Sequence, residues 1–311
     1  MIKNLLVCLI LIFTCTLNVS CHSSLRIPET RWTMINVTPA ELQADCHLIE
    51  FPDGSTALID VADAADAPGT ALRFLQKREI RHIDLVIVSH IHRDHYGRLV
   101  DLIKSGVTVG RVAINIPASR EIADVERPWG CDWEDVQATL QFLTDHKIPY
   151  FTPKAGDRLI EMSVRGASVH LDVICLFDGI STPIGRTDIN DTSIIVRLAH
   201  GATRALFTGD LNSGLGSFLA ASDFDLSADL LKAPHHGTEG TAPNEFYARV
   251  GPKAVLVPSP IKLWFSLRSK RTREYFVEHG TPTYISGLNG DVAVTLTAIG
   301  FTVGSERPAQ H

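Results

Sequence analysis

Three features that are scarce in this sequence narrow what the chain can be. None of its six cysteines has the C-x-x-C spacing of a thiolate zinc site. Basic residues are outnumbered 29 to 35 by acidic ones, and the net charge of −6 opposes long-range attraction of nucleic acid, although a local basic groove stays open. No apolar run reaches the roughly 20 residues that a membrane-spanning helix needs. What is present, 311 residues with 45% hydrophobic content, suits a folded chain with a substantial core.

The N-terminus has the pattern of an export signal. Lys3 precedes an apolar stretch over residues 5–17, so we interpret residues 1–20 as a signal peptide. Residues 17–21, Leu-Asn-Val-Ser-Cys, are similar to a bacterial lipoprotein cleavage box with Cys21 as the lipidated residue. Asn18 stands where that box usually has an aliphatic residue, so simple cleavage to a soluble periplasmic protein and a retained N-terminal anchor stay open.

Signal removal defines the mature chain. It takes away one lysine and no acid, leaving 28 basic and 35 acidic residues, net −7, with residues 21–30 as a leader. We therefore expect an exported protein, periplasmic or lipid-anchored to the bacterial envelope, that touches the membrane only through such an anchor. With Cys21 lipidated, Cys46, Cys131 and Cys175 allow at most one disulfide, whose pairing the sequence does not select.

Residues 89–95, Ser-His-Ile-His-Arg-Asp-His, are the densest group of metal-ligating side chains. They follow the apolar run 83–88, which is typical of a buried strand, so they belong to a strand-to-helix loop. His90 and His92, one residue apart on extended chain, face one side and can share a divalent ion. Asp94 and His95 can point at a second ion nearby. The alternative, a polar loop with unrelated histidines, is disfavoured by four ligand-type residues at this spacing.

Strands and helices are expected in two batches. The first has strands over 31–37, 46–51, 56–61, 83–88 and 107–116, with helices over 68–80 and 95–104. The second has strands over 148–151, 158–164, 169–177, 193–198, 204–207, 228–232, 254–258, 283–285 and 292–296, with helices over 132–146, 213–221, 243–250 and 270–279. This order predicts an α/β fold in which two sheets pack face to face with helices outside, a four-layer αββα sandwich formed by one domain over residues 31–305.

One long segment, residues 117–133, has no regular pattern and carries Trp129 and Trp133. Loops of this length inside a compact domain are usually functional or mobile. We interpret the segment, named here the flap, as facing the substrate. Surface packing of its two tryptophans is the alternative.

Ligand-type residues also follow other predicted strands. Asp210 comes after a strand and a glycine that permits a sharp turn, where a carboxylate can bridge two cations, and His235 follows the strand over 228–232. Asp60, near the end of the hairpin, is either a partner of a metal-bound histidine or a cap of the next loop. Lys232 pairs with Asp210 or with substrate, or is a solvated lysine at a strand end.

Together these motifs resemble the metallo-β-lactamase superfamily and, within it, the ComEC-like branch related to the hydrolase domain of competence DNA-uptake proteins. Residues 190–193 match that branch's N-x-x-S, and residues 232–237, Lys-Ala-Pro-His-His-Gly, match its last motif. The resemblance spans about residues 32–303 and implies an αββα hydrolase with two divalent ions, Zn²⁺ or Mn²⁺. The ligands that it implies are His90, His92, Asp94, His95, Asp210 and His235.

Two departures from the family pattern concern the site. No histidine lies in 190–193, so the first ion has only His90, His92 and Asp210 as side-chain ligands, with Asn190 as a further candidate. The histidine-proline pair that often follows the strand equivalent to 254–258 is also missing. In its place residues 264–273 carry a basic cluster, which is either a solvated helix start or a phosphate-binding group: Arg268, Lys270, Arg271 and Arg273.

The resemblance implies an exported metal-dependent hydrolase that uses a metal-bound hydroxide on phosphoric (di)esters or nucleic acid, a phosphodiesterase- or nuclease-like enzyme. Asp94 would ligate an ion and orient the water, and His236 would donate a proton to the leaving group or only support the site. One alternative is hydrolysis of a carboxylic ester, lactone or lactam in an apolar pocket around Trp129, Trp133, Trp264 and Phe265. Another is a catalytically weak metal-binding module. The substrate is thus a small-molecule or nucleic-acid phosphoester, and no protein partner is indicated.

Overall fold

The computed structural model describes residues 28–37, 43–65, 69–117, 120–179, 182–238, 240 and 242–308. Within this part of the chain the strands form two sheets, ordered β15-β14-β1-β2-β3-β4-β5-β6 and β13-β12-β11-β10-β9-β8-β7. The strands of the first are β1 (Thr30–Met34), β2 (Cys46–Glu50), β3 (Thr56–Val61), β4 (His82–Val88), β5 (Thr108–Ile114), β6 (Tyr150–Phe151), β14 (Val292–Thr297) and β15 (Gly300–Ser305). Those of the second are β7 (Arg158–Val164), β8 (Ala167–Cys175), β9 (Ile195–His200), β10 (Thr203–Phe207), β11 (Leu230–Lys232), β12 (Ala254–Val257) and β13 (Thr283–Ile285).

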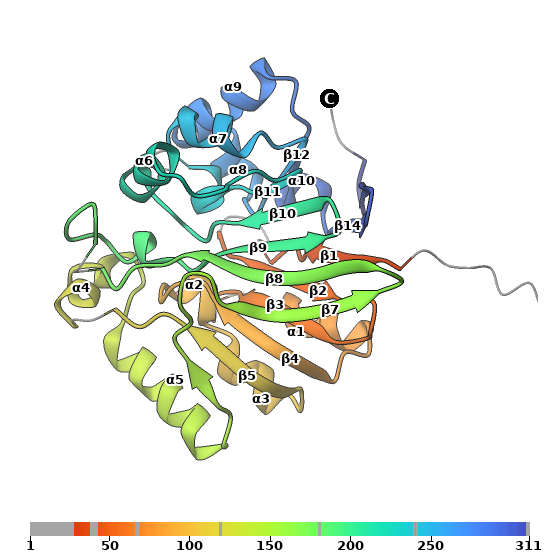
Figure 1. The fold of residues 1–311 in the computed structure, drawn as a ribbon. Coiled ribbons are helices and arrows are strands. Elements are labelled where there is room, and N and C mark those ends of the chain that lie inside the picture. The colour runs from red at the N-terminus through yellow and green to blue at the C-terminus, as the bar shows by residue number, and fades with distance from the viewer. Residues whose placement is uncertain are drawn as a thin grey trace, which may run out of the picture.

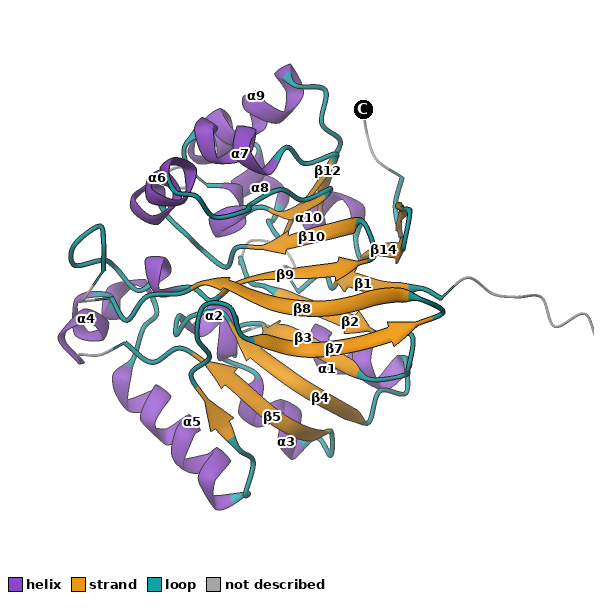
Figure 2. Ribbon diagram, in the orientation of Figure 1, coloured by secondary structure: helices purple, strands orange, loops and turns teal. Residues whose placement is uncertain are grey.

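The helices lie in two groups on opposite sides of the sheets (Figure 1 and Figure 2). The first group comprises α1 (Thr70–Lys77), α2 (Arg93–Tyr96), α3 (Leu99–Lys104), α4 (Arg120–Val125), α5 (Trp133–Asp145) and the 3₁₀ turn η1 (Arg127–Trp129). The second comprises α6 (Ser213–Ala221), α7 (Asn244–Val250), α8 (Ile261–Trp264), α9 (Lys270–Glu278) and α10 (Ser286–Asn289). Three more 3₁₀ turns are η2 (Asn190–Thr192), η3 (Pro234–Gly237) and η4 (Leu267–Ser269).

Three apolar clusters separate the layers. One joins the outer face of the first sheet to α1, α3 and α5, and includes Leu75 and Leu102. A second fills the space between the sheets, where Trp32 and Phe207 meet with ring centroids 4.6 Å apart. The third joins the second sheet to α6, α7 and α9 around Phe246. Helix, sheet, sheet and helix therefore form four layers, and the predicted αββα sandwich is confirmed.

Parallel pairing brings the motifs to one edge of the molecule. Strands β3 to β6 run parallel in the first sheet, and β10 to β13 run parallel in the second. The histidine loop follows β4, Asp210 follows β10, and His235 and His236 follow β11. The two edges are joined by the backbone N–H of Ile194, which donates to Ser89 O at 2.8 Å. Carboxyl ends of parallel strands are where α/β folds bind ligands.

Two predicted elements differ from the structure. The single helix expected over 95–104 is wrong, because the chain breaks between α2 and α3 at Gly97. A Cβ there would lie 2.5 Å from the backbone nitrogen of Ala64, so the loop after β3 packs directly against this break. The flap is not wholly irregular, since it contains α4 and η1.

The remaining predictions concern the N-terminal segment, the cysteines and membrane-spanning helices. The signal segment 1–20 and Cys21 lie outside the described residues. Cys46, Cys131 and Cys175 are buried, and burial raises the thiol pKa of Cys131 and Cys175 to about 12. Among the described helices, none has both the length and the hydrophobicity for a membrane crossing.

Candidate metal centre

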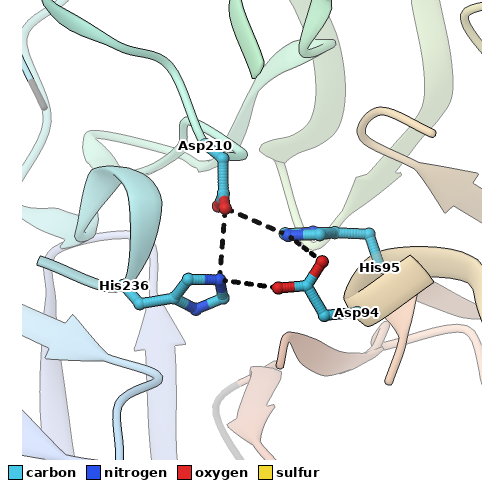
Figure 3. Close-up of side chains that lie close together, drawn as sticks. All are labelled: Asp94, His95, Asp210 and His236. Carbon is cyan, nitrogen blue, oxygen red and sulfur yellow. Dashed lines mark ion pairs between the residues drawn. The ribbon is translucent and has the colours of Figure 1, made fainter. Parts of the chain in front are cut away.

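Four side chains from three separate strand ends form a compact group. Asp94 and His95 come from the turn after β4, Asp210 follows β10, and His236 follows β11 (Figure 3). Asp210 Oδ2 lies 3.2 Å from His95 Nε2 and 3.1 Å from His236 Nε2. Asp94 Oδ2 lies 3.3 Å from His236 Nε2, and one ligand atom of each residue lies within 4.8 Å of all the others. We name this set the second-ion group.

The second-ion group fits a divalent cation. His95 Nε2 and His236 Nε2 are buried and, in the described chain, make no well-aligned hydrogen bond, although each faces a carboxylate oxygen. Two imidazole nitrogens and two carboxylates that converge on one point form a donor set that Zn²⁺ and other divalent ions accept. The structure thus places His236 in this group, where the sequence analysis had set His235.

Adjacent imidazoles form a second, more open set. His90 Nε2 lies 3.1 Å from His92 Nδ1, and Asn190 Oδ1 lies 3.0 Å from the same His92 nitrogen. At this distance only one proton fits between the two imidazole nitrogens. Both nitrogens and the amide oxygen of Asn190 are possible metal ligands, so one ion can take the place of that proton. The rings of His90 and His95 have centroids 4.1 Å apart, so this set, named the first-ion group, borders the second.

The N-x-x-S segment supplies both ends of its motif to the site. Asn190 reaches His92, as above. Ser193 Oγ accepts the backbone N–H of Asp210 at 3.0 Å and lies 3.4 Å from His90 Nδ1. Gly209 has a φ of 51°, and a Cβ on it would collide with Ser193, so the turn into Asp210 requires glycine. This segment therefore positions the carboxylate that the two groups share.

Side chains behind the second-ion group hold its histidines in place. Asp60 Oδ2 lies 2.8 Å from His95 Nδ1 and accepts Ser89 Oγ at 2.9 Å, so the role predicted for Asp60 as a histidine partner fits its position. Asp45, whose part in the site the sequence analysis missed, lies with its Oδ1 3.2 Å from His236 Nδ1. No motif marks Asp45; only its place directly before β2 brings it to this edge.

Lys232 is buried below Asp210. Its ammonium group forms an ion pair with Asp45, lies 3.2 Å from Asp210 Oδ1, and donates to Gly209 O at 2.7 Å. Of the roles considered for Lys232, pairing with Asp210 is the one that the structure contains. Burial acts to lower the pKa of Lys232, but the carboxylates of Asp45 and Asp210 raise it, so the side chain is charged.

Charges inside the second-ion group shift its pKa values in opposite directions. Burial acts to raise the pKa of Asp94, but the positive charge of His95 and the contact with His236 lower it to about 2. Burial acts to lower the pKa of His95 and His236, but Asp210 and the other carboxylates raise it well above the ordinary value. The carboxylates therefore favour the protonated form of His95 and His236 when no cation is bound.

His235 lies at the rim of the two groups. Its side chain is 18% exposed, and its Nε2 is 3.9 Å from Asp210 Oδ2. Nδ1 lies 2.7 Å from Asn212 Oδ1, and Asn212 Nδ2 donates to Asp188 Oδ2 at 2.8 Å. These contacts turn Nε2 toward the site, and the sequence analysis identified neither Asn212 nor Asp188.

The flap borders the first-ion group. Glu126 Oε2 lies 3.7 Å from His92 Nε2, and the backbone N–H of Arg93 donates to Gly130 O at 3.0 Å. Trp129, between these two contact points in the chain, is 77% exposed, whereas Trp133 is half-buried. The flap thus adjoins the site, as the substrate-facing interpretation requires.

The apolar residues of the alternative pocket lie in different surroundings. Trp264 is buried against Gly237. Phe265, the next residue in the chain, is exposed, and Trp129 belongs to the flap. A hollow of about 1090 Å³ lies between α1 and strands β1, β14 and β15, and no predicted metal ligand lines it. The basic cluster is tied to its own neighbourhood, since Arg271 donates to Asn244 Oδ1 at 2.7 Å and Arg273 to Trp264 O.

Known proteins share this sequence pattern and fold. Residues 39–129 match the family described as the metallo-beta-lactamase superfamily. ComE operon protein 3 of Bacillus subtilis (strain 168) is 22% identical over 190 residues, which is 59% of this chain and 21% of that protein. The chain thus corresponds to about a fifth of the length of this relative.

Solved structures give the same fold. The metallo-β-lactamase fold protein YhfI from Bacillus subtilis is 14% identical with a TM-score of 0.52, over 89% of this chain and 100% of that one. CmlA, a diiron β-hydroxylase from Streptomyces venezuelae, is 13% identical with a TM-score of 0.50, over 87% of this chain and 54% of that one. With its two facing sheets, its histidine loop after β4 and these similarities, the chain has the metallo-β-lactamase fold and resembles the metallo-β-lactamase superfamily and, within it, the ComEC-like branch.

Proposed function

We propose that this protein hydrolyses phosphoric esters, phosphodiesters or nucleic acid among them, with two divalent ions at the metal centre. One observation carries the proposal: Asp210 Oδ2 lies 3.2 Å and 3.1 Å from two buried imidazole nitrogens that make no well-aligned hydrogen bond among the described residues, and a second set of imidazoles adjoins it. A carboxylate shared between two ligand groups is the arrangement that two-ion hydrolysis needs.

Each side chain then has a role set by its place. The first ion would be held by His90, His92 and Asp210 with Asn190 and, from the rim, His235. The second would be held by Asp94, His95, Asp210 and His236. When bound, Zn²⁺ or Mn²⁺ lowers the pKa of water and neutralises charge on the phosphoryl group. Asp94 stays a carboxylate at neutral pH, because the adjacent histidines hold its pKa at about 2, and it can accept a hydrogen bond from the attacking water. His236, with Nδ1 2.9 Å from Pro258 O and Nε2 among the carboxylates, serves as a ligand instead of a proton donor.

The phosphoester substrate is supported by resemblance and by the surroundings of the site. The ComEC-like pattern of residues 190–193 and 232–237 favours a phosphodiester over a lactam. The aromatic residues that an apolar acyl pocket would use are dispersed over the flap and α8. The flap, which adjoins His92, carries an exposed tryptophan that can stack on a nucleobase.

A substrate panel tests the proposal. Purified protein would be assayed with bis(p-nitrophenyl) phosphate, single-stranded DNA, an aryl lactone and a chromogenic lactam, each with Mn²⁺, Zn²⁺ or chelator. We expect metal-dependent turnover of the phosphodiesters only. His92→Ala should reduce the rate at least about 100-fold, because a histidine with one nitrogen in the first-ion group is removed. His82→Ala is the control, since His82 lies at the other end of β4.

The outcomes separate the candidates. Turnover of the lactone or lactam alone would replace the phosphoester proposal with an acyl one. Absence of bound metal in the purified protein, or an undiminished rate in His92→Ala, would refute two-ion hydrolysis.

We also propose export, on the N-terminal pattern alone. Fractionation of a bacterial host that expresses the full chain should recover the protein in the envelope or periplasm. Mass spectrometry of the N-terminal peptide would separate lipidation at Cys21 from simple cleavage. Recovery of the full-length chain from the cytosol would contradict export.

A further inference from the structure

An ion pair without solvent access underlies the second-ion group. Lys232 is 1% exposed and Asp45 is fully buried. Burying two charges is costly unless both find partners, and replacing such pairs by apolar residues often stabilises a protein. Stability alone therefore does not explain the buried ion pair of Lys232 and Asp45.

The contacts of Asp45 point to two metal ligands. Its Oδ1 lies 3.2 Å from His236 Nδ1, which also faces Pro258 O at 2.9 Å, and its Oδ2 lies 3.9 Å from His95 Nδ1. A carboxylate behind a metal-bound imidazole fixes the tautomer and the direction of the ring. His47 lies on the other side of Asp45, with its Nε2 3.8 Å from Oδ2, and its Nδ1 accepts Trp32 Nε1 at 3.3 Å.

The contacts of Lys232 point to the shared carboxylate. Its ammonium lies 3.2 Å from Asp210 Oδ1, while the other oxygen, Oδ2, faces His95 and His236. Lys232 also donates to Gly209 O, and its own carbonyl accepts Thr208 Oγ1 at 2.9 Å, which ties both residues before Asp210 to β11. The lysine thus determines which oxygen of Asp210 is left for the ions.

We propose that Lys232 and Asp45 act as one positioning unit for the second ion, in which Asp45 aims His236 and Lys232 turns Asp210 Oδ2 toward the metal. The inference rests on the proposed two-ion site. Neither residue contacts the ion or the substrate. A permanent cation at this point also offsets part of the charge of the carboxylates of Asp45, Asp60, Asp94 and Asp210, which would otherwise repel one another.

Isosteric neutral variants test the unit. Lys232→Met and Asp45→Asn each leave one buried charge without its partner, so either single variant can fail to fold. The deciding protein is the double variant Lys232→Met/Asp45→Asn, which has no unpaired charge in the pair. A matched control is Lys253→Met/Asp229→Asn. That pair is 2.8 Å apart at the opposite, exposed end of β11.

The readouts are metal stoichiometry, the dissociation constant of each ion by competition with a chelator, and the visible spectrum of the Co²⁺-loaded full chain. We expect the double variant to fold, to bind the second ion about 10- to 100-fold more weakly, and to lose less affinity for the first ion, which depends on the unit only through Asp210, with an altered Co²⁺ spectrum. The control variant should match the wild type in all three.

Each outcome decides something. A folded double variant that binds both ions with wild-type affinity and spectrum would overturn the inference while leaving the proposed function intact. Equal weakening of both ions would also overturn it, since Asp45 aims His236, a ligand of the second ion alone. A wild-type chain that binds no ion would refute the proposed function, and the inference with it.

Discussion

Consecutive histidines at the end of β11 have different surroundings. His235 and His236 both have positive φ, 45° and 54°, a conformation that costs energy in any residue but glycine. The strain points their side chains in different directions. His236 is buried among Asp45, Asp94 and Asp210, whereas His235 lies at the rim with Nε2 toward Asp210. One strained turn can therefore serve both ion groups.

His235 offers a test of the incomplete first-ion group at this scale. Since Asn212 Oδ1 faces Nδ1, the Nδ1 proton is held there and the Nε2 lone pair is free for an ion. His235→Gly relieves the positive φ and should fold. We expect it to bind the first ion about 10- to 100-fold more weakly and the second unchanged, with recovery in added imidazole, as measured by chelator competition. Unaltered affinity for both ions would exclude His235 as a ligand.

The residues of the site differ in how far the sequence could predict them. Four predicted metal ligands lie in one short loop, where their spacing limits the directions of the side chains: His90, His92, Asp94 and His95. Local sequence is therefore enough to predict them as ligands. Asp45 and Asn212 belong to no motif, and their roles come from contacts between segments far apart in the chain. Which of His235 and His236 points into the second-ion group depends on the backbone φ and ψ angles of η3. Two adjacent histidines in a sequence do not indicate those angles.

At the scale of elements, the flap is the segment that we expect to contact the substrate. It reaches the site at two points, Glu126 beside His92 and Gly130 beside Arg93, and its Trp129 stays exposed between them. An exposed aromatic ring beside the proposed two-ion site suits a stacked nucleobase, which contributes about 1–3 kcal/mol.

Trp129→Ala should therefore raise KM for a single-stranded oligonucleotide about 5- to 100-fold and leave kcat unchanged. KM for bis(p-nitrophenyl) phosphate, which has no base, should stay the same in steady-state assays. Tyr150→Ala on β6 is the control, because that ring is also exposed but belongs to the edge of the first sheet. Equal changes for both substrates would show that Trp129 supports the flap and does not bind the base.

The local sequence pattern predicted the boundaries of helices and strands best where one face of the element is buried. α6 was predicted over its observed range, and β7 also, because apolar periodicity and turn residues agree there. The break after α2 was not predictable, since it depends on the approach of Ala64 to Gly97. The edge strand β15 was missed because its exposed alternation, paired only with β14, resembles a polar tail.

At the scale of the whole molecule, the fold places many like charges in one dry edge. Asp45, Asp60 and Asp210 are nearly inaccessible to solvent, and Asp94 is little exposed. Lys232 and two protonated histidines balance them when no ion is bound. Two divalent ions would take the place of those protons, so metal binding and folding stability are linked through pH.

This linkage predicts opposite pH trends for the metal-free and metal-loaded protein. The pKa values of His95 and His236 are raised well above 6.5 in the folded chain, so their stabilising contribution is complete below about 6.5 and is lost as pH rises through the folded values. The Tm of chelator-treated protein should therefore fall between pH 6.5 and pH 9. The increase in Tm on adding excess Zn²⁺ should grow over the same range, because fewer protons compete for Nε2. Differential scanning fluorimetry across that range measures both, with His236→Asn as a variant that should lose part of each trend. A metal-induced Tm increase that does not change with pH would mean that the ion does not displace protons from these histidines, and the ligand set proposed for the second ion would then be incorrect.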